Sequence, residues 1–218
     1  MIRAAIFDMD GTLLDTMPLW QNAGALYLAG LGVEAEPGLG DRLFAMTMAE
    51  GAAYLQERYK LGRSTAEILA GIDRVTRGFY ERDAPLKRGA ASFLAGLQAR
   101  GIPMALATTT PRPCAEAALR RLGAGGYFRA LLTADEVGAG KDKPVLFLRA
   151  AAKLGCPPSE TMVVEDALYA VRTAKAAGFF TVGVYDAASA DRQTQLREEC
   201  GCYLMDLQDF DGFAAKYL

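Results

Sequence analysis

The stretch that decides the fold is residues 3–16, Arg-Ala-Ala-Ile-Phe-Asp-Met-Asp-Gly-Thr-Leu-Leu-Asp-Thr. Residues 3–7 predict a short buried strand, and Asp8 and Asp10 follow where that strand ends. Side chains two positions apart in an extended chain point the same way, so both carboxylates can reach one site. Neighbouring carboxylates repel each other, and a chain that places them together usually holds a metal ion, a proton-transfer task or both. An Asp–Gly turn after a strand is the simpler interpretation.

Length and composition bound the class of protein. The chain has 218 residues and is about half hydrophobic, which suits one large domain or a domain with a smaller insert. A net charge of −2 gives no electrostatic reason to expect nucleic acid or an anionic membrane as a partner. No apolar run approaches the roughly 20 residues of a membrane span. Asp8 and Asp10 interrupt the early apolar run, so we expect no signal peptide and a cytoplasmic protein.

Cysteine and histidine usage narrows the chemistry. The spacing of the cysteines fits no zinc motif, which predicts free thiols in a reducing cytosol; they are Cys114, Cys156, Cys200 and Cys202. Histidine is absent, which excludes Ser–His and Cys–His nucleophile pairs and His-ligated zinc. Any catalysis therefore rests on carboxylates, lysine, hydroxyls and a hard metal ion.

The sequence pattern that indicates secondary structure changes twice along the chain. From about residue 18 to residue 82, strand-like runs vanish and helix formers dominate, which predicts an all-helical insert with Ser64 as one N-cap. The helical runs are 21–31, 42–59 and 65–81. After Pro85, apolar strands alternate with helices. The predicted strands are 102–107, 130–133, 161–164, 179–184 and 202–205, and the predicted helices are 89–100, 114–122, 145–154 and 167–177. This alternation favours a parallel doubly wound sheet, in which ligands bind beyond the carboxyl ends of the strands.

Chemically capable side chains fall at those strand ends. Thr108 ends the second strand, Lys141 and Lys143 follow the third, and Glu165-Asp166 ends the fourth. Each has a simpler interpretation when taken alone. The threonine could cap a strand end, and the acid pair could cap the next helix.

In this order, the acid pair, hydroxyl, lysine and second acid pair resemble the four motifs of the haloacid dehalogenase (HAD) superfamily, in its phosphatase and β-phosphoglucomutase-like branch. The resemblance covers essentially the whole chain. It implies an α/β fold, a Rossmann-like doubly wound parallel core with an inserted all-helical cap of type 1. The core would be residues 1–16 and 84–218, and the cap residues 17–83. The cap would close over the site and recognise the leaving group of the substrate.

The resemblance also implies a role for each candidate residue. Asp8 would be the nucleophile that forms an aspartyl-phosphate, and Asp10 the general acid and base. Thr108 and Lys141 would hold the transferring phosphoryl group. Mg²⁺, which prefers oxygen ligands, would take the side chains of Asp8 and Asp166 and the backbone carbonyl of Asp10, with Glu165 bound either directly or through a water.

Two motifs depart from the usual family pattern. The lysine motif reads Gly-Lys-Asp-Lys-Pro rather than Gly-Lys-Pro-x-Pro, and aligning Gly140 and Pro144 selects Lys141 over Lys143. The second acid pair is followed by Ala167, where many relatives carry serine. Thr109, Thr110 and Arg112 could bind phosphate or simply open the next helix.

The expected function is a Mg²⁺-dependent phosphatase of a small phosphorylated metabolite, with a monomer compatible with the sequence. One alternative is a sugar-phosphate mutase resembling β-phosphoglucomutase. That enzyme has a histidine and an arginine in its cap. This chain has Trp20 at the place of the histidine and Thr47-Met48 near the place of the arginine, which disfavours the mutase. A non-catalytic phospho-metabolite binding protein would not need Asp10. A dehalogenase would not need Glu165-Asp166. Trp20 is expected in cap or hinge packing.

Overall fold

The computed structural model describes residues 1–44 and 46–218. Its contacts divide the chain into two compact units. Unit 1 comprises Met1–Asp15 with Ala84–Leu218, and unit 2 comprises Thr16–Asp83. Each unit has its own buried core.

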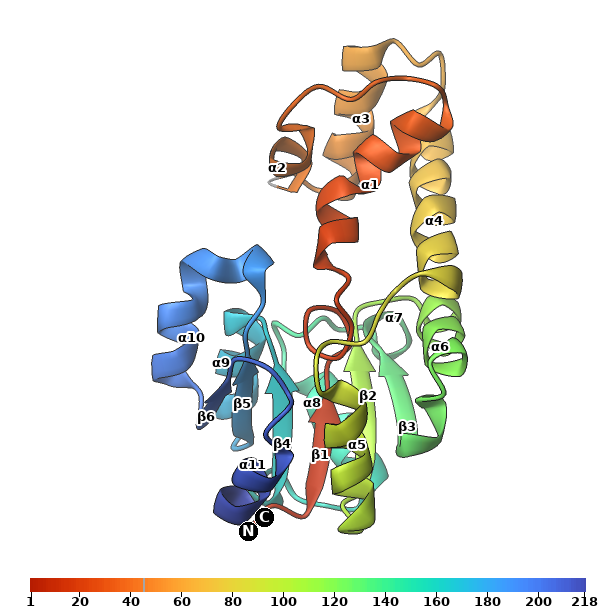
Figure 1. Ribbon diagram of the computed structural model, residues 1–218. Helices are drawn as coiled ribbons and strands as arrows, with labels where there is room; N and C mark the ends of the chain where they lie inside the picture. Colours follow the sequence, from red (N-terminus) through yellow and green to blue (C-terminus); the bar gives the residue numbers. More distant parts are fainter. Residues whose placement is uncertain (45) are drawn as a thin grey trace. The chain divides into compact units, whose positions relative to one another are not determined.

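Unit 1 is built on a six-stranded parallel sheet in the order β3-β2-β1-β4-β5-β6 (Figure 1). The strands are β1 (Ala4–Phe7), β2 (Met104–Thr108), β3 (Phe128–Thr133), β4 (Thr161–Glu165), β5 (Phe180–Val184) and β6 (Cys202–Leu204). The chain runs outward from β1 to β3 and then returns to place β4 on the other side of β1. The predicted doubly wound α/β fold is confirmed.

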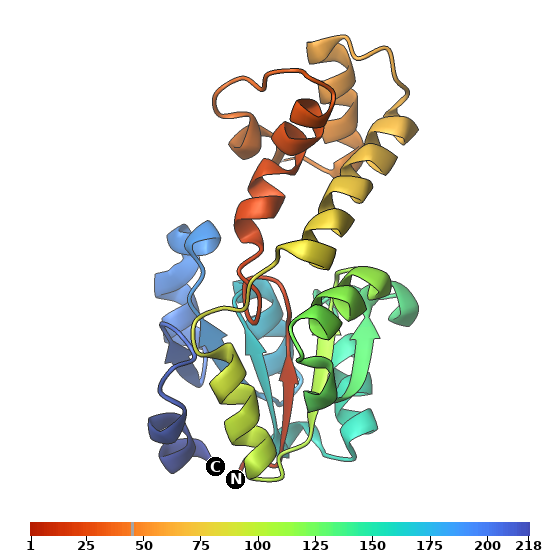
Figure 2. The ribbon, with the colours of Figure 1, turned by 45° about the vertical axis from the view of Figure 1, so that its right-hand side comes forward.

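Helices cover both faces of the sheet (Figures 1 and 2). On one face, Ile6 and Val163 pack with α8 (Val145–Leu154) and α9 (Leu168–Ala176). Phe7, one residue after Ile6, points to the opposite face because side chains alternate along a strand. There it meets Phe93 of α5 (Ala90–Ala99), which also contacts Phe210 of α11 (Phe210–Tyr217). Apolar strand residues are thus buried on both faces of the sheet.

The remaining helical segments of unit 1 are short. They are α6 (Arg112–Arg121), η1 (Gly125–Tyr127), α7 (Ala134–Val137), η2 (Pro158–Glu160), η3 (Ala187–Arg192) and α10 (Gln193–Glu199). The sequence patterns did not predict α7, α10 or α11. Helices α7 and α10 are short, whereas α11 does carry apolar residues at helical spacing, namely Phe210, Phe213, Ala214 and Tyr217.

The two segments of unit 1 that border unit 2 are hydrogen-bonded to each other. The Asp15 amide donates to the Pro85 carbonyl at 3.0 Å, and the Lys87 amide donates to the Leu13 carbonyl at 2.8 Å. Between them, Leu14 and Leu86 form an antiparallel bridge. The chain therefore leaves and re-enters unit 1 through one paired segment.

Every regular element described in unit 2 is a helix: α1 (Met17–Gly30), α2 (Leu39–Phe44), α3 (Met48–Tyr59) and α4 (Thr65–Arg82). Ser64 caps α4 as predicted, in a reciprocal capping box with Glu67. The predicted helical run 42–59 is not one helix, because Thr47 forms the same motif with Glu50 and starts α3 there.

The apolar core of unit 2 includes Leu28, Leu55 and Ile68, which come from different helices. Trp20 of α1 donates its indole hydrogen to the Tyr80 hydroxyl of α4 at 3.1 Å. Their ring centroids lie 6.5 Å apart. This contact places Trp20 in packing within unit 2.

Two predictions of composition can be compared with the structure. All four cysteines are free thiols, as expected. Among the described residues, no helix is both long enough and apolar enough to cross a membrane.

Candidate active site

The predicted functional residues of the core converge at the carboxyl ends of β1, β2 and β4. The order of the strands reverses between β1 and β4, and open α/β sheets bind ligands at such a switch point. Asp8 directly follows β1, and its amide donates to the Val164 carbonyl of β4 at 3.0 Å. Glu165 ends β4 and Asp166 follows it. Parallel pairing of the two central strands thus brings the two acid motifs together.

Three carboxylates form the centre of the site. Asp8, Glu165 and Asp166 each offer an oxygen within 4.8 Å of the others, and the three residues are at most 7% exposed. The carboxylate of Asp10 is not part of this group. Its predicted contribution to a metal site was the backbone carbonyl alone.

Lys141 is the cation inside this cluster. Its ammonium donates to Asp8 Oδ1 and to Glu165 Oε1, and the residue is 4% exposed. Burial lowers the pKa of Lys141, but the charges of Asp8 and Glu165 outweigh burial and raise it above its ordinary value. The lysine therefore stays charged and bridges the first and last motifs.

One lysine does not neutralise three buried carboxylates. Burial raises the pKa of Glu165 to about 7, against the lowering effect of Lys141. Burial, together with the charges of Glu165 and Asp8, also raises the pKa of Asp166 well above its ordinary value. These shifts describe a site with an excess of negative charge, and a divalent cation would compensate that charge. The donor set, all carboxylate oxygen, suits Mg²⁺ and not a zinc-type site.

Asp10 is held by a residue from another strand end. The Thr110 hydroxyl donates to Asp10 Oδ2, and the Thr110 amide donates to the Thr108 hydroxyl at 3.0 Å. Thr108 ends β2 and is fully buried. The predicted hydroxyl motif therefore contributes two side chains, and Thr110 is the one that contacts Asp10.

Gly11 and Thr12 join the first motif to the last. Gly11 adopts a φ of +80°, and a Cβ there would lie 2.5 Å from Asp166 Oδ2. The Thr12 hydroxyl donates to Asp166 Oδ1 at 2.9 Å. The Gly-Thr pair thus allows close approach of the backbone and then orients the carboxylate of Asp166.

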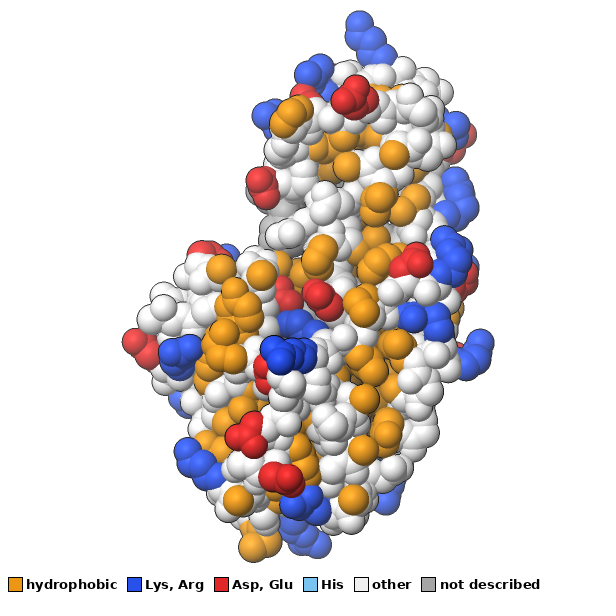
Figure 3. Space-filling model, viewed as in Figure 1, with side chains coloured by type: hydrophobic (Ala, Val, Ile, Leu, Met, Phe, Trp, Pro, Cys, Tyr) orange, Lys and Arg blue, Asp and Glu red, His pale blue; other side chains and the backbone are white. Residues whose placement is uncertain are grey.

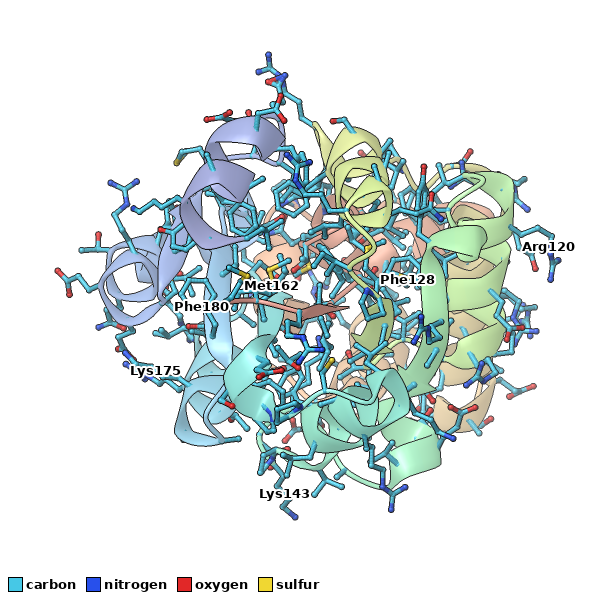
Figure 4. The ribbon with its side chains drawn as sticks, turned by 90° about the horizontal axis from the view of Figure 1, so that it is seen from below. Arg120, Phe128, Lys143, Met162, Lys175 and Phe180 are labelled. Carbon is cyan, nitrogen blue, oxygen red and sulfur yellow. The ribbon has the colours of Figure 1, made fainter. Side chains whose placement is uncertain are left out.

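The structure also separates the weaker candidates. Lys143 is exposed, and Figure 4 shows its side chain at the rim of the molecule, directed away from the sheet. Arg112 is the first residue of α6 and is paired with Glu136 and Glu116. It therefore anchors the start of the helix.

Charge on the surface is mixed. On the face drawn in Figure 3, basic and acidic side chains are interspersed over the coloured atoms, with no broad patch of one sign. The concentration of charge that sets this molecule apart lies in the buried acid cluster.

Comparison with known proteins agrees with this arrangement. The family model of haloacid dehalogenase-like hydrolases matches residues 2–178. A phosphatase of phosphorylated carbohydrates from Thermotoga maritima is 30% identical over 177 residues, covering 81% of this chain and 82% of that protein. Validoxylamine A 7′-phosphate phosphatase from Streptomyces hygroscopicus is 33% identical over 184 residues, covering 84% and 86%. Hexitol phosphatase B from Escherichia coli is 31% identical, covering 81% and 80%.

Solved structures extend the likeness to the whole chain. A candidate β-phosphoglucomutase from Thermotoga maritima superposes with a TM-score of 0.86 at 26% identity and covers 100% of both chains. CbbY from Rhodobacter sphaeroides, solved with phosphate, gives a TM-score of 0.73 at 26% identity and covers 96% of each chain. Together with the family match and the motif order along the strand ends, these likenesses show that the chain belongs to the haloacid dehalogenase-like hydrolase family.

Proposed function

We propose that this protein is a Mg²⁺-dependent phosphatase that hydrolyses a small phosphorylated metabolite through an aspartyl-phosphate on Asp8. The observation that carries the proposal is the convergence of Asp8, Glu165 and Asp166 around Lys141 at the switch point of the sheet. The relatives that are named phosphatases supply the substrate class, because each acts on a small phosphorylated compound.

The residues of the chain can perform both halves of the reaction. In the first half, a carboxylate oxygen of Asp8 attacks phosphorus, the bond to the leaving oxygen breaks, and Asp10 gives its proton to that oxygen. In the second half, Asp10 takes a proton from water, the water oxygen attacks phosphorus, and the bond to Asp8 breaks to release phosphate. Thr110 orients the carboxylate of Asp10 for both transfers.

Electrostatics decides whether such an attack is possible. A phosphate ester and Asp8 are both anionic, so their approach is opposed by Coulomb repulsion. Lys141 already touches Asp8 and can neutralise charge on the transferring group. Asp8, Glu165 and Asp166, with the Asp10 carbonyl, would hold Mg²⁺, which supplies charge neutralisation and alignment when bound. The Thr108 hydroxyl would donate to a phosphoryl oxygen.

The test is phosphate release from a panel of small phosphorylated compounds, measured with Mg²⁺ and with a chelator. The panel comprises sugar phosphates, hexitol phosphates, phosphoglycolate, a nucleotide and pyrophosphate. We expect turnover of at least one small phosphomonoester, lost in chelator. Asp8→Asn should abolish turnover in a folded protein because an amide is neither nucleophile nor anionic ligand, whereas Asp135→Asn, at an exposed position, should not. Activity of Asp8→Asn within about tenfold of wild type would contradict the nucleophile assignment.

A sugar-phosphate mutase is the second candidate, favoured by the likeness to the candidate β-phosphoglucomutase structure. Trp20 and Met48 stand where a mutase is expected to have cap cations, and Trp20 is engaged with Tyr80. Losing a cation that pairs with a second phosphate leaves that charge unpaired. We therefore expect little conversion of β-glucose 1-phosphate to glucose 6-phosphate. Efficient isomerisation that depends on catalytic bisphosphate, with negligible phosphate release, would establish the mutase instead.

A further inference from the structure

Lys87 is a nearly buried cation outside the acid cluster, with its side chain 14% exposed. Its ammonium donates to the Gly11 carbonyl at 2.5 Å and to the Tyr185 carbonyl at 2.7 Å, and pairs with Asp186 Oδ2 at 2.7 Å. An ammonium has three N–H donors, so these contacts use all of them. Lys87 therefore joins the loop after β1 to the loop after β5.

The Gly11 end of this connection leads to Asp166. The carbonyl that Lys87 holds belongs to the peptide between Gly11 and Thr12, which fixes the plane from which the Thr12 side chain starts. The Thr12 hydroxyl then donates to Asp166 Oδ1 at 2.9 Å. Asp166 also lies directly against Gly11, where a Cβ would come within 2.5 Å of its carboxylate.

The other end of the connection is anchored by its own hydrogen bonds. Asp186 is 4% exposed, and its Oδ1 accepts the Ala188 amide at 2.8 Å. The Asp186 carbonyl accepts from the Gln193 side chain at 3.2 Å. Gln193 in turn accepts from the Tyr203 hydroxyl at 2.7 Å. Lys87 thus ties a loop of the acid site to a well-held point of the core.

We propose that Lys87 is a positioning residue for the divalent cation site, acting through the Gly11–Thr12 peptide on the carboxylate of Asp166. The inference rests on the cation site of the proposed function. Partners that orient metal ligands from behind typically change metal affinity by about 10- to 100-fold when they are removed.

Whether removal of Lys87 weakens or strengthens cation binding distinguishes a positioning role from a simple effect of its charge. Lys87 is itself a cation, so by Coulomb's law alone its removal would favour binding of another cation nearby. Weaker cation binding after removal of Lys87 therefore reports the loss of positioning.

The experiment is direct titration of the metal-stripped full chain with Mn²⁺, with free Mn²⁺ followed by electron paramagnetic resonance and no substrate present. Lys87→Met, Thr12→Val and the double variant are compared with wild type. Lys153→Met, at an exposed position on α8, is the matched control for removing one lysine charge. Circular dichroism of each variant reports folding.

We expect Lys87→Met and Thr12→Val each to weaken Mn²⁺ binding about tenfold, and Lys153→Met to leave it unchanged. Because both residues act on Asp166 through one peptide, the double variant should fall well short of the roughly hundredfold product. Unchanged or tighter binding in Lys87→Met, or a full product in the double variant, would overturn the inference. Failure of the wild-type chain to bind Mn²⁺ would overturn the cation site of the proposed function, and the inference with it.

A second variant covers the case in which Lys87→Met leaves Asp186 buried without its partner and the protein does not fold. Lys87→Met/Asp186→Asn removes both charges of the pair and keeps the side-chain oxygen that accepts the Ala188 amide. Its net charge equals that of wild type, so charge alone predicts unchanged affinity. Positioning predicts weaker Mn²⁺ binding by about tenfold, and unchanged affinity would overturn the inference.

Discussion

The Thr110 hydroxyl donates a hydrogen bond to the carboxylate of Asp10, although the two residues are 100 positions apart in the chain. Hydrogen bonds to charged groups contribute about 1.5–3 kcal/mol. If Asp10 transfers protons, losing this bond should lower kcat by roughly 10- to 100-fold with little change in KM. Thr110→Val tests this by steady-state phosphate release. Thr109→Val, at an exposed neighbouring position, is the control, and equal rates in the two variants would contradict the role of Thr110.

Gly11→Ala should inactivate the enzyme for a reason other than backbone strain. Alanine at positive φ costs about 1–2 kcal/mol, and this cost applies equally to Gly101→Ala at φ +70°. Of these two positions, only Gly11 would bring the new Cβ against a carboxylate, that of Asp166, whereas a Cβ at Gly101 meets nothing within 4 Å. Gly101→Ala should lose a few degrees of thermal midpoint, at roughly the size expected from such a cost, and Gly11→Ala should lose at least as much. Only Gly11→Ala should lose phosphate release, and retention of full activity there would contradict the proposed role of Asp166.

Lys141 and Lys143 should differ sharply in function. Lys141 contacts Asp8 and Glu165 inside the acid cluster, whereas Lys143 is exposed. Lys141→Ala should lower kcat/KM by about 10² or more, the size of effect expected when a group that stabilises transition-state charge is lost. Lys143→Ala should stay within about twofold of wild type, as exposed substitutions usually do. A larger loss in Lys143→Ala would show that the lysine motif is placed two residues too early.

Stability without metal should fall as pH rises. The folded-state pKa of Glu165 is about 7, above its ordinary value of 4.5, and that of Asp166 is raised in the same direction. A raised folded pKa means that the folded state holds protons which the unfolded chain releases. Its contribution to stability is complete below about pH 4.5 and is lost as pH rises through about 7.

The same protons compete with a cation, since carboxylates must be deprotonated to bind one. The thermal midpoint in chelator should therefore fall between pH 5 and pH 8, and the stabilisation by Mg²⁺ should grow over that range. Differential scanning fluorimetry in matched buffers measures both. Glu165→Gln, which cannot titrate, should flatten the pH dependence. An equal Mg²⁺ shift at pH 5 and pH 8 would count against a carboxylate cation site.

The parts of the fold that the sequence predicted are those with a local cause. The strand before Asp8 is a short apolar run, and α4 begins after Ser64, the predicted N-cap, which the structure shows in a capping box with Glu67. The candidate site residues could be recognised in the sequence because each lies at or after the end of a predicted strand, and parallel strands end at one edge of the sheet. Asp8, Glu165 and Asp166 meet for that reason.

The parts that escaped prediction depend on contacts between distant segments. Phe210 and Phe213 of α11 lie at helical spacing, but the residue that they pack against is Phe93, more than 100 positions away, and the local sequence does not identify it. The contacts of Lys87 with Gly11 and Tyr185 likewise span 76 and 98 positions. From the sequence alone, a lysine in a loop is expected to be exposed to solvent. Only the folded structure shows that the ammonium of Lys87 has three acceptors.

The antiparallel bridge between Leu14 and Leu86 affects how costly it is to change the length of the segment inserted between them. Because residues 15 and 85 are already neighbours in unit 1, whatever joins them closes a loop whose ends are held together by the core. Doubling the length of such a loop costs only about 0.6 kcal/mol of closure entropy. The entropy of closing this loop therefore changes little between inserts of very different length, because the core itself holds the two ends together.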